Sequence, residues 1–219
     1  MYSEGNTLMG SGFVLSGTSS ESQSLLSDFF FQVVFVASVV SIVSGTLAER
    51  VRLWPFLAFT LVLMAFIYPI QGHWSWGGIA LSGLMAGFSD FAGSTIVHSV
   101  SGWAALAGAI LLGVRKGKYG PDGKVNAIPG SNLPMAALGT FILWLGWFGF
   151  NGGSQLVLGS KGDADTISTV FANTIIDACA GAVVAMILTQ LLYKKVDLTM
   201  VLNGSLSGLV TITAGPDYP

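Results

Sequence analysis

The chain has 219 residues, of which 52% are hydrophobic and only 9% are charged, against about 25% charged residues in an average soluble domain. Its net charge of −2, with no rich basic patch, argues against a nucleic-acid partner. Its single cysteine, Cys179, excludes a disulfide framework or a cysteine metal cluster. This composition is typical of an integral membrane protein.

Six apolar stretches predict an all-α fold, a polytopic bundle of transmembrane helices. A spanning helix needs about 20 mostly apolar residues, and the chain offers six such spans in order: 29–48, 53–71, 91–114, 133–151, 167–193 and 198–215. The segment between 71 and 90 is apolar but broken by five glycines. We expect it to form an outer loop with short helical or re-entrant pieces.

The positive charges predict the orientation of these spans. If the spans alternate in direction, eight of the nine Lys and Arg residues fall on one side, and only Lys161 falls on the other. The positive-inside rule makes the first side cytoplasmic. The loops at 49–52, 115–132 and 194–197 are therefore predicted to be cytoplasmic.

Asp90 and His98 stand out in the third predicted span. Asp90 lies just before the span, where a carboxylate ordinarily accepts hydrogen bonds from the first backbone N–H groups of a helix. His98 lies eight residues on, which is about 12 Å deeper at 1.5 Å per residue. A histidine inside a span either faces a cavity or is packed against a neighbouring hydrogen-bond partner, and its position alone favours neither alternative.

Aromatic residues gather at the predicted outer ends of several spans. An interfacial belt facing lipid explains most such residues in membrane proteins. A cage of rings facing one another would instead attract a small cation, by roughly 0.5 to 2 kcal/mol. The residues concerned are Phe31, Phe35, Trp74, Trp76, Phe148 and Phe150.

Five motifs, taken together and in order, resemble the ammonium transporter, Mep and Rh superfamily, and within it the ammonium transporter branch. They are "SGTLAERVR" at 44–52, "DFAGSTIVH" at 90–98, "WFGFNGGS" at 147–154, "FANT" at 171–174 and "NGSLSGLVTITAGP" at 203–216. The resemblance implies an inverted-repeat fold of about eleven helices, of which residues 1–219 would hold the third to the eighth. We therefore expect an internal fragment that lacks the second pore histidine and cannot complete the conduction path alone.

The resemblance also implies transport of ammonium or ammonia through a hydrophobic pore. Outer recruitment of the ion would fall to Trp76, Ser154 and Phe35, and a phenyl gate to Phe35 with Phe150. His98 would be the first pore histidine, able to accept or relay a proton because imidazole has both donor and acceptor nitrogens. Asp90 would cap the helix beneath the recruitment site.

The same resemblance implies a homotrimer and a PII-type nitrogen regulatory protein as a partner at the cytoplasmic face. An ammonium sensor or a non-conducting regulatory subunit on the same scaffold is the alternative function. An intramembrane enzyme or haem-binding subunit would need a second ligand for His98, and the only candidate, Asp177, shares no motif with it. Since no phosphate loop, zinc spacing or nucleophile elbow is present, we expect no enzyme activity, no cofactor and no metal.

Overall fold

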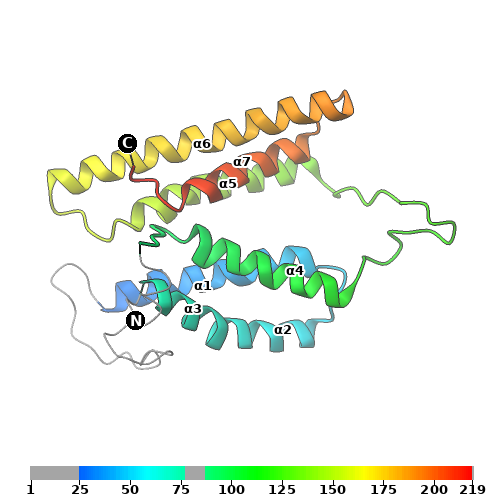
Figure 1. Ribbon diagram of the computed structural model, residues 1–219, viewed down its shortest axis with the longest axis horizontal. Helices are drawn as coiled ribbons and strands as arrows, with labels where there is room; N and C mark the ends of the chain where they lie inside the picture. Colours follow the sequence, from blue (N-terminus) through cyan, green and yellow to red (C-terminus); the bar gives the residue numbers. More distant parts are fainter. Residues whose placement is uncertain (1–24, 77–86, 219) are drawn as a thin grey trace. The chain divides into compact units, whose positions relative to one another are not determined.

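The computed structural model of the protein describes residues 25–76 and 87–218 (Figure 1). Over these ranges the regular elements are helices, with one isolated β-bridge between Tyr119 and Val125. The expected all-α fold is confirmed. In chain order the helices are α1 (Leu25–Leu47), α2 (Leu53–Val62), the π-helix η1 (Leu63–Ile67), α3 (Tyr68–Trp76), the π-helix η2 (Ser94–Ser99), α4 (Val100–Leu112), α5 (Leu133–Gly153), α6 (Lys161–Tyr193) and α7 (Leu198–Ile212).

Five helical stretches of the described residues are long and apolar enough to cross a membrane. They are Leu26–Leu47, Leu53–Trp76, Ser94–Leu112, Leu133–Gly153 and Lys161–Tyr193, and α7 is a shorter apolar helix. Several bounds differ from the sequence expectation, two of them by five residues or more. The second stretch continues through α3 to Trp76, where a loop was expected from residue 71, and α6 begins at Lys161 instead of 167.

The chain divides into two compact units. The first consists of the residues up to Phe88 together with Thr95–Pro129, and so contains α1 to α4. The second consists of Ser89–Ser94 and Gly130–Pro219, and so contains α5 to α7. The part of the expected outer loop at 77–86 lies outside the described residues.

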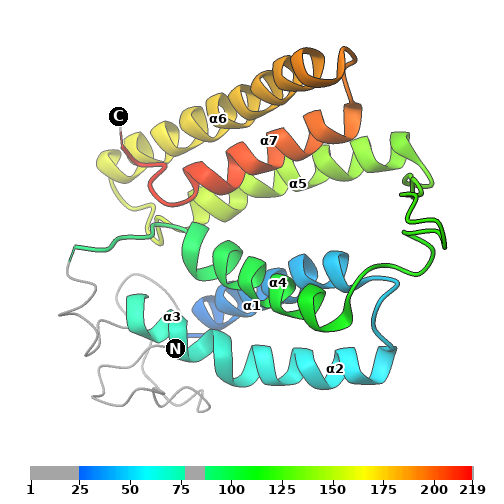
Figure 2. The same cartoon turned by 45° about the vertical axis from the view of Figure 1, so that its right-hand side comes forward.

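The first unit is built around the pair α1 and α4, which lie side by side in both views (Figures 1 and 2). The buried residues of α1 recur every four positions, which places them on one face of the helix. Gly108 of α4 meets this face, since a Cβ atom there would lie 2.6 Å from Leu47 Cδ2. The stripe consists of Phe35, Val39, Val43 and Leu47.

The second unit is built around α6 and α7, two helices joined by residues 194–197. Their backbones touch at glycines: a Cβ atom on Gly181 would lie 2.1 Å from the Gly204 carbonyl oxygen, and one on Gly208 would lie 2.0 Å from that of Asp177. Small residues permit such close approach of helices in lipid, where dispersion drives the packing. Asp197 begins α7, because its Oδ1 accepts hydrogen bonds from Thr199 N (2.8 Å) and Met200 N (3.2 Å).

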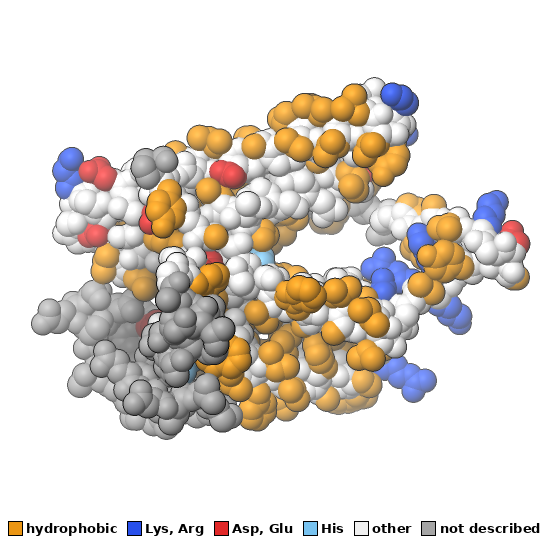
Figure 3. Space-filling view, in the orientation of Figure 1, with side chains coloured by type: hydrophobic (Ala, Val, Ile, Leu, Met, Phe, Trp, Pro, Cys, Tyr) orange, Lys and Arg blue, Asp and Glu red, His pale blue; other side chains and the backbone are white. Residues whose placement is uncertain are grey.

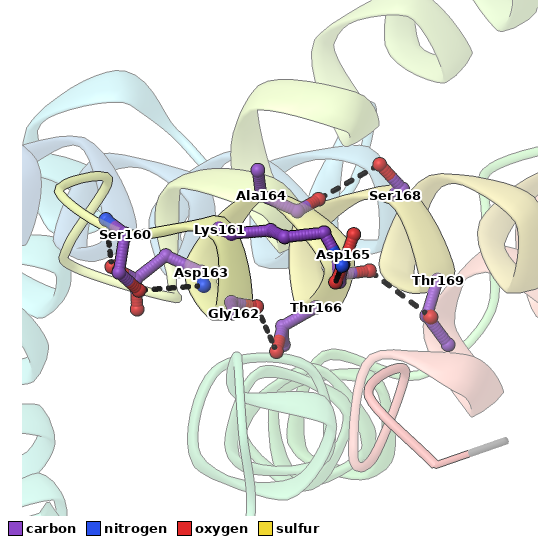
Figure 4. A network of polar contacts seen from close by, with 9 residues as sticks. All are labelled: Ser160, Lys161, Gly162, Asp163, Ala164, Asp165, Thr166, Ser168 and Thr169. Atoms are coloured by element: carbon purple, nitrogen blue, oxygen red, sulfur yellow. Dashed lines mark hydrogen bonds and ion pairs between the residues drawn. The ribbon is translucent and has the colours of Figure 1, made fainter.

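A reciprocal cap explains why α6 begins so early (Figure 4). Ser160 Oγ accepts a hydrogen bond from Asp163 N (3.2 Å), and Asp163 Oδ2 accepts one from Ser160 N (2.9 Å). Lys161 also pairs with Asp165 at 3.3 Å. The two reciprocal bonds satisfy the amides of Ser160 and Asp163, which have no partner inside the helix. Hydroxyls in the next turn donate to carbonyls four residues back, at Thr166, Ser168 and Thr169.

The surface of α6 shows how such a helix suits a membrane (Figure 3). Apolar side chains such as Ile187 and Leu191 are exposed along its length. Charged residues lie in its first turns and directly after its end, with the half-buried Asp177 as the exception. An exposed apolar surface with charged ends is expected of a helix surrounded by hydrocarbon.

Candidate functional site

Asp90 belongs to the second unit and holds the start of η2, whose first residue, Ser94, belongs to the same unit. Its side chain is 4% exposed, and Oδ1 accepts hydrogen bonds from Gly93 N (3.0 Å) and Ser94 N (2.9 Å). Gly93 adopts φ +104°, which a residue with a side chain rarely tolerates. This carboxylate therefore satisfies amides at a helix start, as a capping residue does.

The residues after Asp90 bond to the end of α7. Phe91 N donates to the Ala214 carbonyl (2.8 Å), and Ala92 N donates to the Thr213 carbonyl (3.0 Å). Segments more than a hundred residues apart in the sequence are thus joined by backbone hydrogen bonds. The depth expected for His98 assumed an α-helix from residue 91, whereas the helix begins at Ser94 and begins as a π-helix.

His98 lies in the π-helical turn η2, in the first unit. A π turn is wider than an α turn, and π turns occur often at functional sites. Its side chain is partly buried. Two hydrogen bonds fix the backbone beside it: Gln71 Nε2 donates to the Ile96 carbonyl (2.8 Å), and the buried Ser101 Oγ donates to the Val97 carbonyl. The backbone that carries His98 is therefore braced from α3 and from α4.

An aromatic cluster also lies in the first unit. The rings of Phe31 and Phe35 have centroids 4.6 Å apart, and Phe35 meets Trp76 edge-on at 6.0 Å and 89°. Edge-to-face geometry is a favoured arrangement of aromatic quadrupoles. Phe35 is only 2% exposed, so an interfacial belt does not account for it. Since α3 extends to Trp76, this residue is placed by a helix and not by a loop.

Phe150 and Ser154 lie at the C-terminal end of α5, in the second unit. Ser154 follows the last residue of the helix, and its Oγ donates to the Phe150 carbonyl (2.8 Å). The Phe150 ring packs against Trp147 with centroids 5.7 Å apart. Phe35 and Phe150 thus belong to different units.

A buried polar network supports this end of α5, and sequence reasoning missed it. Trp147 Nε1 donates to Thr213 Oγ1 (2.8 Å), Thr213 Oγ1 contacts Asn151 Oδ1 (3.1 Å), and Asn151 Nδ2 donates to Thr174 Oγ1 (3.0 Å). The last three side chains are fully buried. The signal was available, because a polar residue inside a span must find a partner.

The remaining candidates fall outside these clusters. His73 is 1% exposed on α3, in a stretch for which a loop was expected. Asp177 is half-buried in α6, and Cys179 is exposed. Among the residues that the structure describes, no group of three or more His, Cys, Asp or Glu side chains could hold a metal ion.

A family model described as Ammonium Transporter Family matches residues 1–218. The chain belongs to this family. It is 47% identical over 211 residues to ammonium transporter Amt2 of Archaeoglobus fulgidus, covering 93% of this chain and 44% of that protein. It is 42% identical to a putative ammonium transporter of Synechocystis, covering 87% of this chain and 43% of the relative.

Solved structures agree with this assignment. A structure titled Sensor Amt Protein matches with a TM-score of 0.80 and 44% identity, over 87% of this chain and 47% of that one. The crystal structure of Candida albicans Mep2 matches with a TM-score of 0.77 and 29% identity, over 89% of this chain and 41% of that one. The ammonium transporter family member described here is a multi-pass integral membrane protein. It spans less than half the length of the curated relatives it matches.

Proposed function

We propose that this chain supplies one part of a pathway for transmembrane transport of ammonium or ammonia. The observation that carries the proposal is the Phe31–Phe35–Trp76 cluster, whose rings contact one another in the same unit as His98. The faces of aromatic rings attract a small cation. An aromatic recruitment site followed by a titratable imidazole is an arrangement suited to an ion that can shed a proton.

The chemistry of the ion explains the proposed roles. Ammonium donates hydrogen bonds and binds to aromatic rings, but a charge in a dry lumen costs several kcal/mol. Loss of a proton lets neutral ammonia pass, whereas potassium has no proton to lose and is rejected. In this proposal Trp76, Phe35 and Ser154 recruit the ion and Phe35 with Phe150 forms the gate. His98 lines the pore.

The orientation belongs to the same proposal, with 49–52, 115–132 and 194–197 on the cytoplasmic side. It is supported by contacts within the first unit: Arg50 Nη1 donates to the Gly113 carbonyl (2.9 Å), and Arg115 pairs with Glu49 at 3.6 Å. The two basic connections therefore lie at one end of this unit. A homotrimer, and a PII-type regulator docking on the cytoplasmic face, complete the proposal for the whole protein.

Methylammonium uptake into cells lacking their own ammonium uptake tests the transport role. Residues 1–219 alone are expected to give no uptake, and a chimera in which residues 1–218 replace the matching stretch of the Archaeoglobus Amt2 is expected to give uptake. In that chimera, Trp76→Leu should raise the KM roughly 2- to 30-fold, the range of one cation–π contact. His98→Ala should reduce uptake severely. Trp54→Leu is the control, because Trp54 is 79% exposed on α2.

Ammonium sensing on the same scaffold is the second candidate function. It is favoured by the match to the structure titled Sensor Amt Protein. A chimera that binds ammonium through Trp76 but shows no uptake, although it reaches the membrane folded, would favour sensing over transport. Uptake that is unchanged by Trp76→Leu and His98→Ala would overturn the assignment of both residues.

A further inference from the structure

Gln71 carries an amide into an apolar groove of the first unit. The groove has a volume of about 500 Å³ and lies between α1, α2, η1 and α4. In the part of the chain that the structure describes, the rest of its lining is aliphatic, aromatic or glycine. Placing an amide among such side chains costs free energy unless a hydrogen bond compensates for the lost water. The partner of this amide therefore indicates what Gln71 does.

The partner is a backbone carbonyl inside the π-helical turn η2. Gln71 Nε2 donates to the Ile96 carbonyl oxygen at 2.8 Å, across 25 residues of sequence. Ile96 is 1% exposed and Val97 is fully buried, so little water competes for this bond. A side chain that inserts into the backbone ladder of a helix is a recognised cause of irregular turns. His98 follows Ile96 by only two residues.

The form of this turn decides which way His98 points. A π-helix closes its hydrogen bonds one residue further along the chain than an α-helix does, and one residue corresponds to a rotation of about 100° around a helix axis. A change of η2 from π to α would therefore swing the His98 side chain by up to about that angle. The second bond in this region, from Ser101 Oγ to the Val97 carbonyl, is local to one helical segment. Only the bond from Gln71 ties the turn to another element.

The other element is α3, the helix that also carries Trp76. Gln71 and Trp76 are five residues apart in α3, which is about 7.5 Å along its axis at 1.5 Å per residue. Trp76 meets the Phe35 ring edge-on, with centroids 6.0 Å apart. One short helix thus presents a ring of the aromatic cluster and donates the hydrogen bond that holds the turn carrying His98.

We propose that Gln71 is a positioning residue for transport, whose hydrogen bond to the Ile96 carbonyl holds the His98 imidazole in the orientation that the pore requires. The proposal rests on the proposed function, which gives His98 its place in the pore. Trp76 is held by its contact with Phe35, to which Gln71 does not contribute. Gln71 therefore controls the passage of a bound ion and not its recruitment. A purely structural role would lower the amount of folded protein and leave the rate per folded molecule unchanged.

Methylammonium uptake by the Amt2 chimera, expressed per folded molecule in the membrane, tests this role. Gln71→Met keeps the length of the side chain and removes the donor. Misplacing a reacting group by about 1 Å can cost up to about 100-fold in rate, so we expect the maximal rate to fall at least about tenfold. The KM should stay within about twofold of the wild type, whereas Trp76→Leu should change the KM, because a change in KM alone reports lost binding.

Two further variants accompany Gln71→Met. Gln71→Asn keeps an amide that is one methylene too short to reach Ile96, so the maximal rate should fall at least about threefold with little change in KM. It replaces Gln71→Met if the methionine variant does not fold. Gln190→Met is the matched control, since Gln190 is exposed on α6, and should change neither constant by more than about twofold.

The orientation of His98 is measured separately from transport, by NMR of ring-labelled histidine in residues 1–219 in micelles. The chain has two histidines, so His98→Ala assigns the signals. Gln71→Met should shift the ring signals of His98, and Gln190→Met should leave them in place.

Unmoved His98 signals, or an unchanged maximal rate per folded molecule in Gln71→Met and Gln71→Asn, would overturn the proposal. A rise in KM at an unchanged maximal rate would place Gln71 in recruitment and would overturn it too. A chimera without uptake before any substitution would count against the proposed transport function instead. The NMR comparison would then still decide whether Gln71 orients His98, so the two failures are distinguishable.

Discussion

The helix pairs α1–α4 and α6–α7 both approach closely at glycines, but different atoms face those glycines. Gly108 of α4 faces the end of the Leu47 side chain, 2.6 Å from where a Cβ atom would lie. A Cβ atom on Gly208 of α7 would lie 2.0 Å from the Asp177 carbonyl oxygen. A leucine side chain can change rotamer, whereas a carbonyl inside a helix is fixed by the helix. The first unit can therefore adjust at its helix contact, and the second unit cannot.

This difference agrees with the surroundings of each contact. In the first unit the adjustable contact borders an apolar groove between α1, α2, η1 and α4, since Leu47 and Gly108 both line it. The fixed contact lies in the unit where Asn151, Thr174 and Thr213 are buried and hydrogen-bonded. A satisfied buried network rigidifies its surroundings. We infer that the second unit is the firmer support, and four measurements can break or sharpen that inference.

The largest effect is expected for Gly208→Ala. The new methyl group would overlap the Asp177 carbonyl, so α6 and α7 must separate, at a cost of about 3 kcal/mol, the upper part of the usual range for overpacking. Unfolding in mixed micelles, followed by circular dichroism as the fraction of denaturing detergent rises, measures the loss.

Gly146→Ala is the control for this change. Gly146 lies in α5 with nothing within 4 Å of its Cβ position, so alanine should leave stability unchanged or raise it by up to about 1 kcal/mol through helix propensity. Equal behaviour of the two variants would mean that α6 and α7 do not make the backbone contact.

The next effect is expected for Thr213→Val. Loss of the hydroxyl removes the acceptor of Trp147 Nε1 and the partner of Asn151 Oδ1 in a buried site, which should lower stability by about 1 to 3 kcal/mol. Thr211→Val makes the same change on an exposed part of α7, where the hydroxyl bonds only to the Ser207 carbonyl. A loss of similar size in Thr211→Val would show that the buried network contributes no more to stability than one exposed hydroxyl does.

These residues also show how far the sequence could be interpreted. Apolar length located helices near all six expected spans, of which five are long enough to cross a membrane. The position of Asp90 predicted the hydrogen bonds that it accepts from Gly93 and Ser94. The π-helical turn around His98 was not predictable, because it depends on packing and not on local propensity. The partners of Thr213 come from α5, about sixty residues away in the chain, and no periodicity records such a pairing.

For the candidate site, too, the sequence predicted which residues matter, whereas packing decided how they are placed. Chemical type and motif order selected Phe35, Trp76, His98, Phe150 and Ser154, and the structure shows the edge contact between the rings of Phe35 and Trp76. The extension of α3 to Trp76 was missed because glycines nearby suggested a loop. In a membrane helix glycine is common, so it is a weaker signal of a break than in a soluble protein.

A smaller effect is expected for Gly108→Ala. The new methyl group would meet only the Leu47 side chain, which can rotate, and alanine is the better helix former by about 1 kcal/mol. The net change in the free energy of unfolding should stay below about 1 kcal/mol, in the same micelle assay. A loss as large as that of Gly208→Ala would break the contrast between the two helix pairs.

The smallest effect concerns Asp197, at the start of α7. Hydrogen bonds from the Thr199 hydroxyl and the Met200 amide lower the pKa of Asp197 below its usual 3.8. The folded state therefore binds protons less readily than the unfolded state does. This stabilisation is fully present above the unfolded pKa of about 3.9, and it is lost as pH falls through the folded value. Asp197→Asn should accordingly be less stable than the wild type at pH 7, and the difference should shrink below about pH 4.

Thr199→Val sharpens the Asp197 experiment, because it removes the largest cause of the lowered pKa. Titration of the Asp197 carboxyl by carbon NMR should then show its pKa moving up towards 3.8. Stability differences between Asp197→Asn and the wild type that do not change with pH would mean that the carboxylate does not hold the start of α7. In that case the fixed packing of this helix would rest on Gly204 and Gly208, through their contacts with α6.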